Sequence, residues 1–177
     1  MKRFLATLLL ASAAAVAFAQ NSLIRPRMEI AEFEENGISL EVFYMDDESP
    51  RVYYLSLGHL GVGSDIVQIQ FDPLYELFIP LGNTLEESIG KMEEIKEYYA
   101  QPRLWTTEIT GRFAVAYPND EPVSVNVTSR RLLTSKLLEF SLPSPDDLVR
   151  GTLVTRGQFN SLLNSLRFYR KIHPKEQ

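Results

Sequence analysis

The sequence predicts an α+β fold built from two pseudo-repeats, each with four antiparallel strands followed by one helix. Three observations support this class. Short alternating or β-branched runs recur in the same order after about 71–73 positions, turn residues separate them, and each half ends in an amphipathic helical pattern. Because strands joined by short turns pair antiparallel, we expect the helices to cover one face of the sheet.

The strands are expected in two matching sets. The first pseudo-repeat spans about residues 36–100 and the second about 108–173, with residues 20–35 as a variable lead-in. Period-two alternation over short runs bounded by turn residues is typical of strands. Four pairs of runs match in order: 38–44 with 112–117, 53–57 with 123–127, 64–71 with 135–142, and 77–79 with 152–154.

A capping box predicts the start of each helix. Thr84 with Glu87, and Thr155 with Gln158, have the spacing in which a hydroxyl and the third following side chain satisfy unpaired N–H groups reciprocally. A stripe of apolar residues follows at helical spacing in both cases. These stripes are Leu85, Ile89, Met92 and Tyr99 in the first helix, and Phe159, Leu162, Leu163, Leu166 and Tyr169 in the second.

The first 19 residues have the three parts of a cleavable export signal. A basic Lys2-Arg3 start precedes the apolar run 4–16, and Ala17-Phe18-Ala19 supplies the small residues that cleavage requires. We therefore expect one mature domain of residues 20–177, periplasmic or secreted after cleavage following Ala19. The apolar run is too short for a stable span, so the expected product is soluble and has no transmembrane anchor.

Charge is distributed unequally between the halves. Residues 20–100 carry a formal charge of −11 and residues 101–177 carry +4. A net-acidic chain argues against general binding to nucleic acids or anionic membranes, because phosphate contacts need a positive field. The first helix is rich in glutamate, whereas the second ends with Arg167, Arg170 and Lys171. We expect these charges to attract each other across adjacent helices.

The residue inventory excludes several chemistries. The chain has no cysteine and two histidines, so disulfides, thiolate zinc sites, cysteine nucleophiles and multi-histidine metal sites are not expected. His59 has no evident triad partner, and the acidic turns 46–48 and 119–121 lack the glycine-punctuated spacing of a calcium loop. We expect no cofactor, no metal and no catalytic residue, although the sequence leaves enzymatic activity open.

The candidate ligand or partner surface combines aromatic and basic residues. Tyr53 and Tyr54 are adjacent in a predicted strand, so one of them should face away from the helices. Trp105 falls in the connection between the halves, and Arg130 and Arg131 border a loop of the second half. An open sheet face with aromatic residues can bind a protein or a glycan.

The predicted function is therefore an exported, non-catalytic binding module for a protein or a glycan. The alternative is a cell-envelope hydrolase or a single-stranded nucleic-acid binder. Tandem units of four strands and a helix also occur in the purine-rich-element-binding repeats and the Whirly proteins, which bind single-stranded nucleic acid. The chain resembles them in element order alone, and this implies a topology rather than an activity.

Overall fold

The chain forms an antiparallel sheet of eight strands and two long helices, and this confirms the predicted α+β class. The computed structural model describes residues 27–35, 38–59, 61–62, 76–113, 122–143 and 149–174. The sheet strands are β1 (Arg27–Glu35), β2 (Ile38–Met45), β3 (Tyr53–His59), β5 (Glu76–Gly82), β6 (Thr106–Phe113), β7 (Val123–Leu132), β8 (Ser135–Ser141) and β10 (Thr152–Thr155). The helices are α2 (Leu85–Glu97), the 3₁₀ turn η2 (Tyr98–Ala100) and α3 (Arg156–Ile172).

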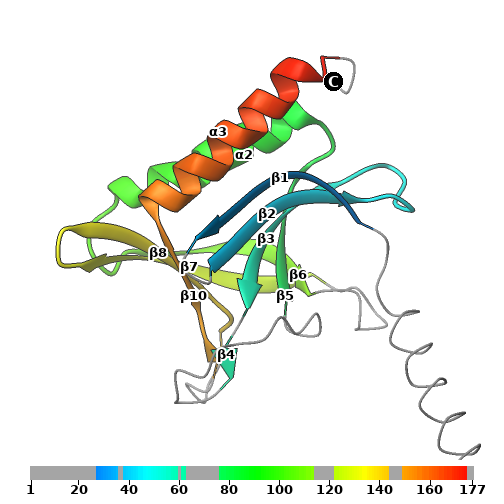
Figure 1. Ribbon diagram of the computed structural model, residues 1–177. Coiled ribbons are helices and arrows are strands. Elements are labelled where there is room, and N and C mark those ends of the chain that lie inside the picture. The colour runs from blue at the N-terminus through cyan, green and yellow to red at the C-terminus, as the bar shows by residue number, and fades with distance from the viewer. Residues whose placement is uncertain are drawn as a thin grey trace, which may run out of the picture.

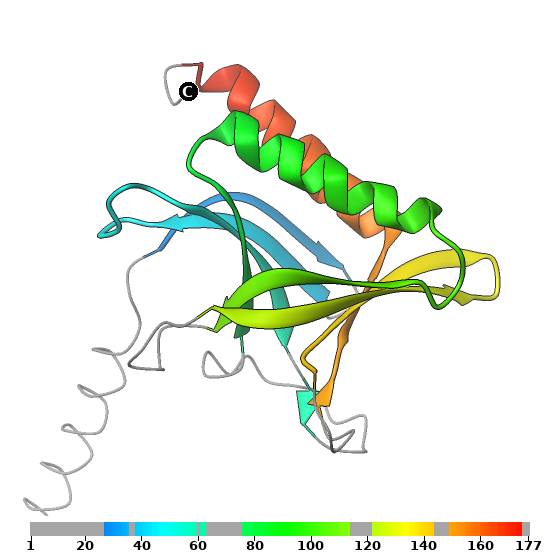
Figure 2. The same cartoon turned by 180° about the vertical axis from the view of Figure 1, so that it is seen from behind.

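The strands follow the order β1-β2-β3-β5-β6-β7-β8-β10 across the sheet, so neighbours in the sequence are neighbours in space. The two halves join where β5 pairs with β6 through Leu77–Phe113 and Phe78–Arg112. Two short strands, β4 (Gly61–Val62) and β9 (Val149–Arg150), form a separate antiparallel pair. Figures 1 and 2 show a strongly curved sheet with both helices side by side above it.

Both capping boxes form as predicted. The Thr84 hydroxyl accepts a hydrogen bond from the Glu87 N–H at 3.1 Å, and the Thr155 hydroxyl accepts one from the Gln158 N–H at 3.2 Å. Gly82, with φ of +148°, precedes the first box, and a Cβ there would meet the Glu87 Cβ at 2.5 Å. A side chain at position 82 would therefore displace the glutamate that closes the box.

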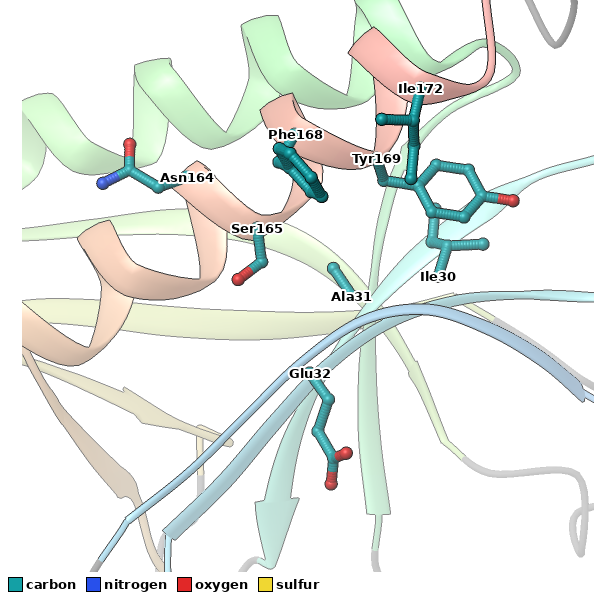
Figure 3. Close-up of a pocket in the computed structure, with 8 residues that line it drawn as sticks. All are labelled: Ile30, Ala31, Glu32, Asn164, Ser165, Phe168, Tyr169 and Ile172. Atoms are coloured by element: carbon teal, nitrogen blue, oxygen red, sulfur yellow. The ribbon is translucent and has the colours of Figure 1, made fainter.

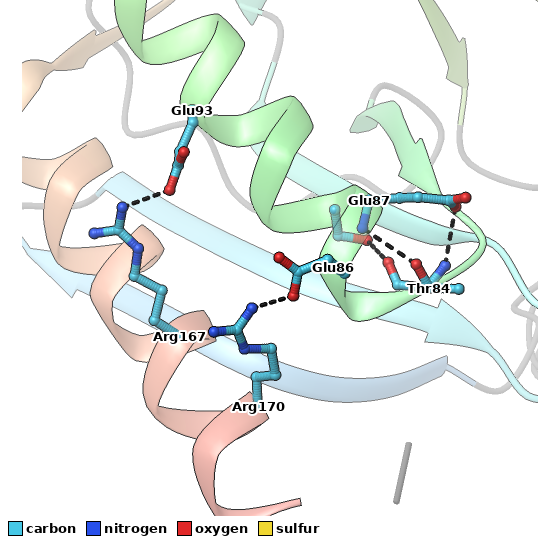
Figure 4. Close-up of polar contacts among 7 residues, drawn as sticks. Thr84, Glu86, Glu87, Glu93, Arg167 and Arg170 are labelled. Carbon is cyan, nitrogen blue, oxygen red and sulfur yellow. Dashed lines mark hydrogen bonds and ion pairs between the residues drawn. The ribbon is translucent and has the colours of Figure 1, made fainter. Parts of the chain in front are cut away.

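The helices lie antiparallel, with acidic α2 against the basic end of α3, as expected. Arg167 Nη2 lies 2.6 Å from Glu93 Oε1. Arg170, one turn later in α3, pairs with Glu86, two turns earlier in α2 (Figure 4). Beneath them, one continuous core contains side chains from both helices and from seven of the sheet strands. Tyr99 and Phe159 join the two helices in that core, with ring centroids 5.9 Å apart.

The expected lead-in is wrong, because residues 27–35 form β1 and pair with β2 along its whole length. The register slips between Glu29 and Ala31, where a bulge interrupts the alternation. The second half likewise starts earlier than predicted, with β6 at Thr106. The predicted strand 64–71 and residues 114–117 lie outside the described residues.

Candidate functional site

The paired tyrosines of β3 are not available to a ligand. Tyr53 and Tyr54 face opposite sides of the sheet, as strand geometry requires, but they are 1% and 3% exposed. Tyr53 belongs to the core beneath the helices. Tyr54 packs with Phe43 and Phe78 on the other side, and its hydroxyl donates to Glu48 at 2.8 Å. The expectation of an open, aromatic sheet face here is wrong, because both faces of β3 are covered.

Trp105 is half-buried against the second half of the molecule. Its ring lies 5.2 Å from that of Tyr98, and its carbonyl accepts a hydrogen bond from the Ser129 N–H at 2.8 Å. Burial, followed by the hydrogen bond to Glu94, raises the pKa of the Tyr98 hydroxyl. These contacts hold the turn before β6 against β7. Trp105 therefore joins the two halves, which was the structural alternative to a ligand-binding role.

Arg130 and Arg131 lie near the end of β7, at the tip of the β7–β8 hairpin. Arg130 forms an ion pair with Glu139 on β8. Arg131 is exposed, and its cross-strand partner is Lys136. The structure thus separates Arg130 and Arg131 from Tyr53 and Tyr54, so the five predicted surface residues do not form one site.

A shallow, open groove lies between β1 and α3. It has a volume of about 510 Å³, and its residues come from the middle of β1 and the last turns of α3. Figure 3 shows Phe168, Tyr169 and Ile172 above Ile30 and Ala31. Phe168 and Ile172 are 63% and 53% exposed. Large apolar side chains left open at a groove are typical of a binding surface.

β1 is also the terminal strand of the sheet, so its outer edge has no strand partner in the described part of the chain. The groove follows this edge at Ile30, Ala31 and Glu32. An unpaired strand edge presents backbone N–H and C=O groups to a binding partner. This edge and the apolar side chains of α3 therefore form two walls of the same groove.

The β1 side of the groove contains one glutamate, Glu32, and further glutamates lie on the same strand. Glu29, Glu32 and Glu34 are exposed, and the Glu32 carboxylate points away from the α3 side chains (Figure 3). On the α3 wall, Asn164 and Ser165 add uncharged polar groups. The ionisable side chains that line the groove are Glu32 and Tyr169, and their polar ends point in different directions (Figure 3). This arrangement can bind apolar and basic groups together.

No family model, curated protein sequence or solved structure matches this chain. Its function must therefore be argued from the groove and the surfaces around it. Within the described ranges, no helix is long and apolar enough to cross a membrane. The same residues hold no group of three or more side chains suited to binding a metal ion.

The sequence did not predict the groove, because neither of its walls contains a recognisable binding motif. β1 was assigned to the lead-in, since the bulge at Ile30 breaks its alternation. The sequence does give one indication of the groove, because Phe168 and Ile172 lie outside the apolar stripe that α3 buries in the core. Large apolar residues on the polar face of an amphipathic helix indicate a second contact surface.

Proposed function

We propose that this chain is an exported, non-catalytic module that binds an extended segment of another protein. The observation that carries this proposal is the groove between the free edge of β1 and the apolar residues of α3. A peptide in such a groove would extend the sheet through main-chain hydrogen bonds, while alternate side chains would contact the helix. Export rests on the signal-like first 19 residues.

The chemistry of the groove defines the segment it would take. Phe168 and Ile172 favour apolar side chains, and the exposed glutamates of β1 favour lysine or arginine at the outward positions. Two copies of β1 would bring these glutamates against each other. Like charges on neighbouring strands oppose pairing, so the edge selects a basic partner over a second copy of itself.

Panning the protein against phage-displayed random linear peptides would test the proposal. The selected peptides should carry basic and apolar residues in alternation, and binding should slow amide hydrogen exchange in β1. Phe168→Ser should weaken the best peptide at least about tenfold, because it removes a large apolar contact. Leu153→Ser is the matched control, since Leu153 is 43% exposed on β10 at the opposite edge of the sheet.

Two results would contradict this function. In the first, the selected peptides bind Phe168→Ser as tightly as the unaltered protein. In the second, an array of oligosaccharides yields binders that displace the peptides and protect α3 but not β1. The second result would make the groove a glycan site, the other ligand class expected from the sequence.

We also infer that the two halves are pseudo-repeats. The sequence predicted four strands and a helix in each repeat, with 38–44 matched to 112–117 and 53–57 to 123–127. We propose instead five strands and a helix in each, β1 to β5 with α2 and β6 to β10 with α3, so that β2 corresponds to β7 and β3 to β8. The short strands β4 and β9 pair with each other, and the two helices lie antiparallel. Both relations are those of corresponding elements that face each other, although the β5–β6 pair has no β10–β1 counterpart in the strand order. Superposing residues 27–97 on 106–172 should align the strands of the two halves in the same order.

A further inference from the structure

The hairpin of β7 and β8 carries two exposed apolar residues at its tip. Leu132 ends β7, Leu133 occupies the turn, and they are 66% and 95% exposed. In Figures 1 and 2 this hairpin runs below the end of α2 and the start of α3 and extends sideways beyond them. We call Leu132 and Leu133 the leucine tip.

The backbone conformation at the leucine tip is unfavourable for a leucine. Leu132 pairs with Ser135, so the hairpin turns through the two residues Leu133 and Thr134. Leu133 has a φ of 55°, a conformation in which glycine or asparagine is preferred and a bulky side chain is strained. Because Leu133 is 95% exposed, packing within the fold does not compensate for this strain. Such positions are candidates for function.

A second exposed leucine also has a positive φ. Leu104 has a φ of 66° and is 61% exposed. Its N–H donates to the Ser129 carbonyl of β7 at 2.8 Å, so it lies beside the base of the same hairpin. Among the described non-glycine residues, Leu104 and Leu133 are the only two with positive φ. Both are exposed leucines of one region of the surface.

The chain as a whole is net acidic, and this argues against general binding to anionic membranes, but the charges around the leucine tip are cationic. Arg131 and Lys136 are direct cross-strand partners, although like charges in this position destabilise a hairpin. Arg103 is exposed beside Leu104. Within the described ranges, none of these three cations has an ion pair. Arg130 is paired with Glu139, so it adds little net charge.

We infer that the leucine tip docks on the surface of a membrane that contains anionic phospholipid. Exposed leucines can enter the headgroup and acyl boundary, while arginine and lysine beside them attract anionic headgroups. A nucleic acid would use the cations but offer little apolar surface for the leucines. Lysine is depleted at protein interfaces, whereas lysine and arginine together suit an anionic lipid surface. The bilayer accounts for the leucines, the strained turn and the opposed cations together.

This inference is independent of the groove between β1 and α3. The tip lies in the β7–β8 half of the sheet, whereas β1 is the terminal strand on the other side of the strand order. Each surface can therefore be removed by substitutions that leave the other intact.

Vesicle sedimentation would test the inference. One set of vesicles contains equal parts of phosphatidylcholine and phosphatidylglycerol, and the other contains phosphatidylcholine alone. The protein should bind the anionic vesicles more tightly, by about fivefold for each cation that reaches the surface. The full chain and the chain beginning at Gln20 should be compared in parallel, because the apolar run 4–16 can bind lipid by itself.

Leu133→Gly is the most informative variant, because it should raise the stability of the protein while weakening its binding to vesicles. Glycine relieves the positive φ, so the melting temperature should rise by about 2–4 °C. Vesicle binding should nevertheless fall about tenfold, because the apolar anchor is lost. Leu153→Ser, an exposed leucine of β10, should leave vesicle binding unchanged. Misfolding cannot produce weaker binding in a protein that has become more stable.

Three results would overturn the inference. One is equal binding of Leu133→Gly and the unaltered protein to anionic vesicles. Another is vesicle binding that is abolished by Arg131→Gln with Lys136→Gln but is unchanged in Leu133→Gly. The tip would then be a general anion site. The third is a concentration-dependent dimer that Leu133→Gly dissociates, with no vesicle binding, since a second copy would then cover the leucines.

Discussion

The hydroxyl of Tyr99 donates a hydrogen bond to the carbonyl oxygen of Val154 at 3.0 Å, across 55 residues of sequence. Tyr99 lies in the turn η2 that follows α2, and Val154 lies in β10 just before α3. Tyr99 is 2% exposed, and its ring also contacts Phe159 in the first turn of α3. One side chain thus connects the end of the first half to the last strand and helix of the second.

Removing this hydroxyl should destabilise the protein without changing its shape. Tyr99→Phe keeps the ring but leaves the buried Val154 carbonyl without this donor, so the free energy of unfolding should fall by about 1–2 kcal/mol. Urea denaturation would measure the change. Tyr98→Phe is the matched control, because the Tyr98 hydroxyl bonds to Glu94 near the surface and should matter little. Equal effects of the two substitutions would contradict the assigned role of Tyr99.

Tyr99 should also make stability fall at alkaline pH. Burial raises the pKa of the Tyr99 hydroxyl in the folded protein, whereas an unfolded tyrosine ionises near about 10. The stabilisation from Tyr99 is therefore complete below about pH 10 and is lost as the pH rises further. Tyr99→Phe lacks this contribution. The difference in the free energy of unfolding between the unaltered protein and Tyr99→Phe should therefore decrease as the pH rises from about 8 to about 10.5. A constant difference across that range would show that Tyr99 does not titrate on unfolding.

The charge pairs between α2 and α3 should depend on salt. Arg167→Glu with Arg170→Glu reverses both pairs, so the free energy of unfolding should fall by about 1–2 kcal/mol at low salt, with a smaller loss at high salt. Lys171→Glu is the control, because Lys171 is exposed at the same end of α3 and has no ion pair among the described residues. If Lys171→Glu costs as much as Arg170→Glu, the effect comes from the helix dipole and not from the pairs.

Both capping boxes should contribute measurably to stability. Thr84→Ala and Thr155→Ala each remove the acceptor for the third N–H of a helix, at a cost of about 1 kcal/mol. Thr84→Ser and Thr155→Ser retain the hydroxyl and should cost only a few tenths of that. Thermal unfolding followed by circular dichroism would compare the four variants. An alanine variant as stable as its serine counterpart would argue against the cap.

Export makes a prediction that mass spectrometry can test. Protein recovered from its native host should begin at Gln20, because Ala17-Phe18-Ala19 precedes that residue. Replacing Ala19 with a bulky residue should block processing and leave the longer chain at the membrane. A full-length product in the cytoplasm would rule out both export and the proposed envelope role.

The sequence predicted those elements whose signal is local. Thr84-x-x-Glu87 and Thr155-x-x-Gln158 define helix starts through contacts within four residues, and both helices begin where these boxes indicate. The opposite charges of the two helices likewise predicted their pairing. β1 was missed because its bulge at Ile30 breaks the period of two, and only pairing with β2 shows it to be a strand.

The sequence by itself determined the α+β class, the two helices with their caps, and the attraction between an acidic and a basic helix. Only the tertiary structure decided which surfaces remain open. Tyr53 and Tyr54 are buried because the sheet is covered on both faces at β3. Phe168 and Leu133 remain exposed because one lies beside a sheet edge and the other at a hairpin tip. Exposure depends on long-range packing, and residue type and periodicity do not encode it locally.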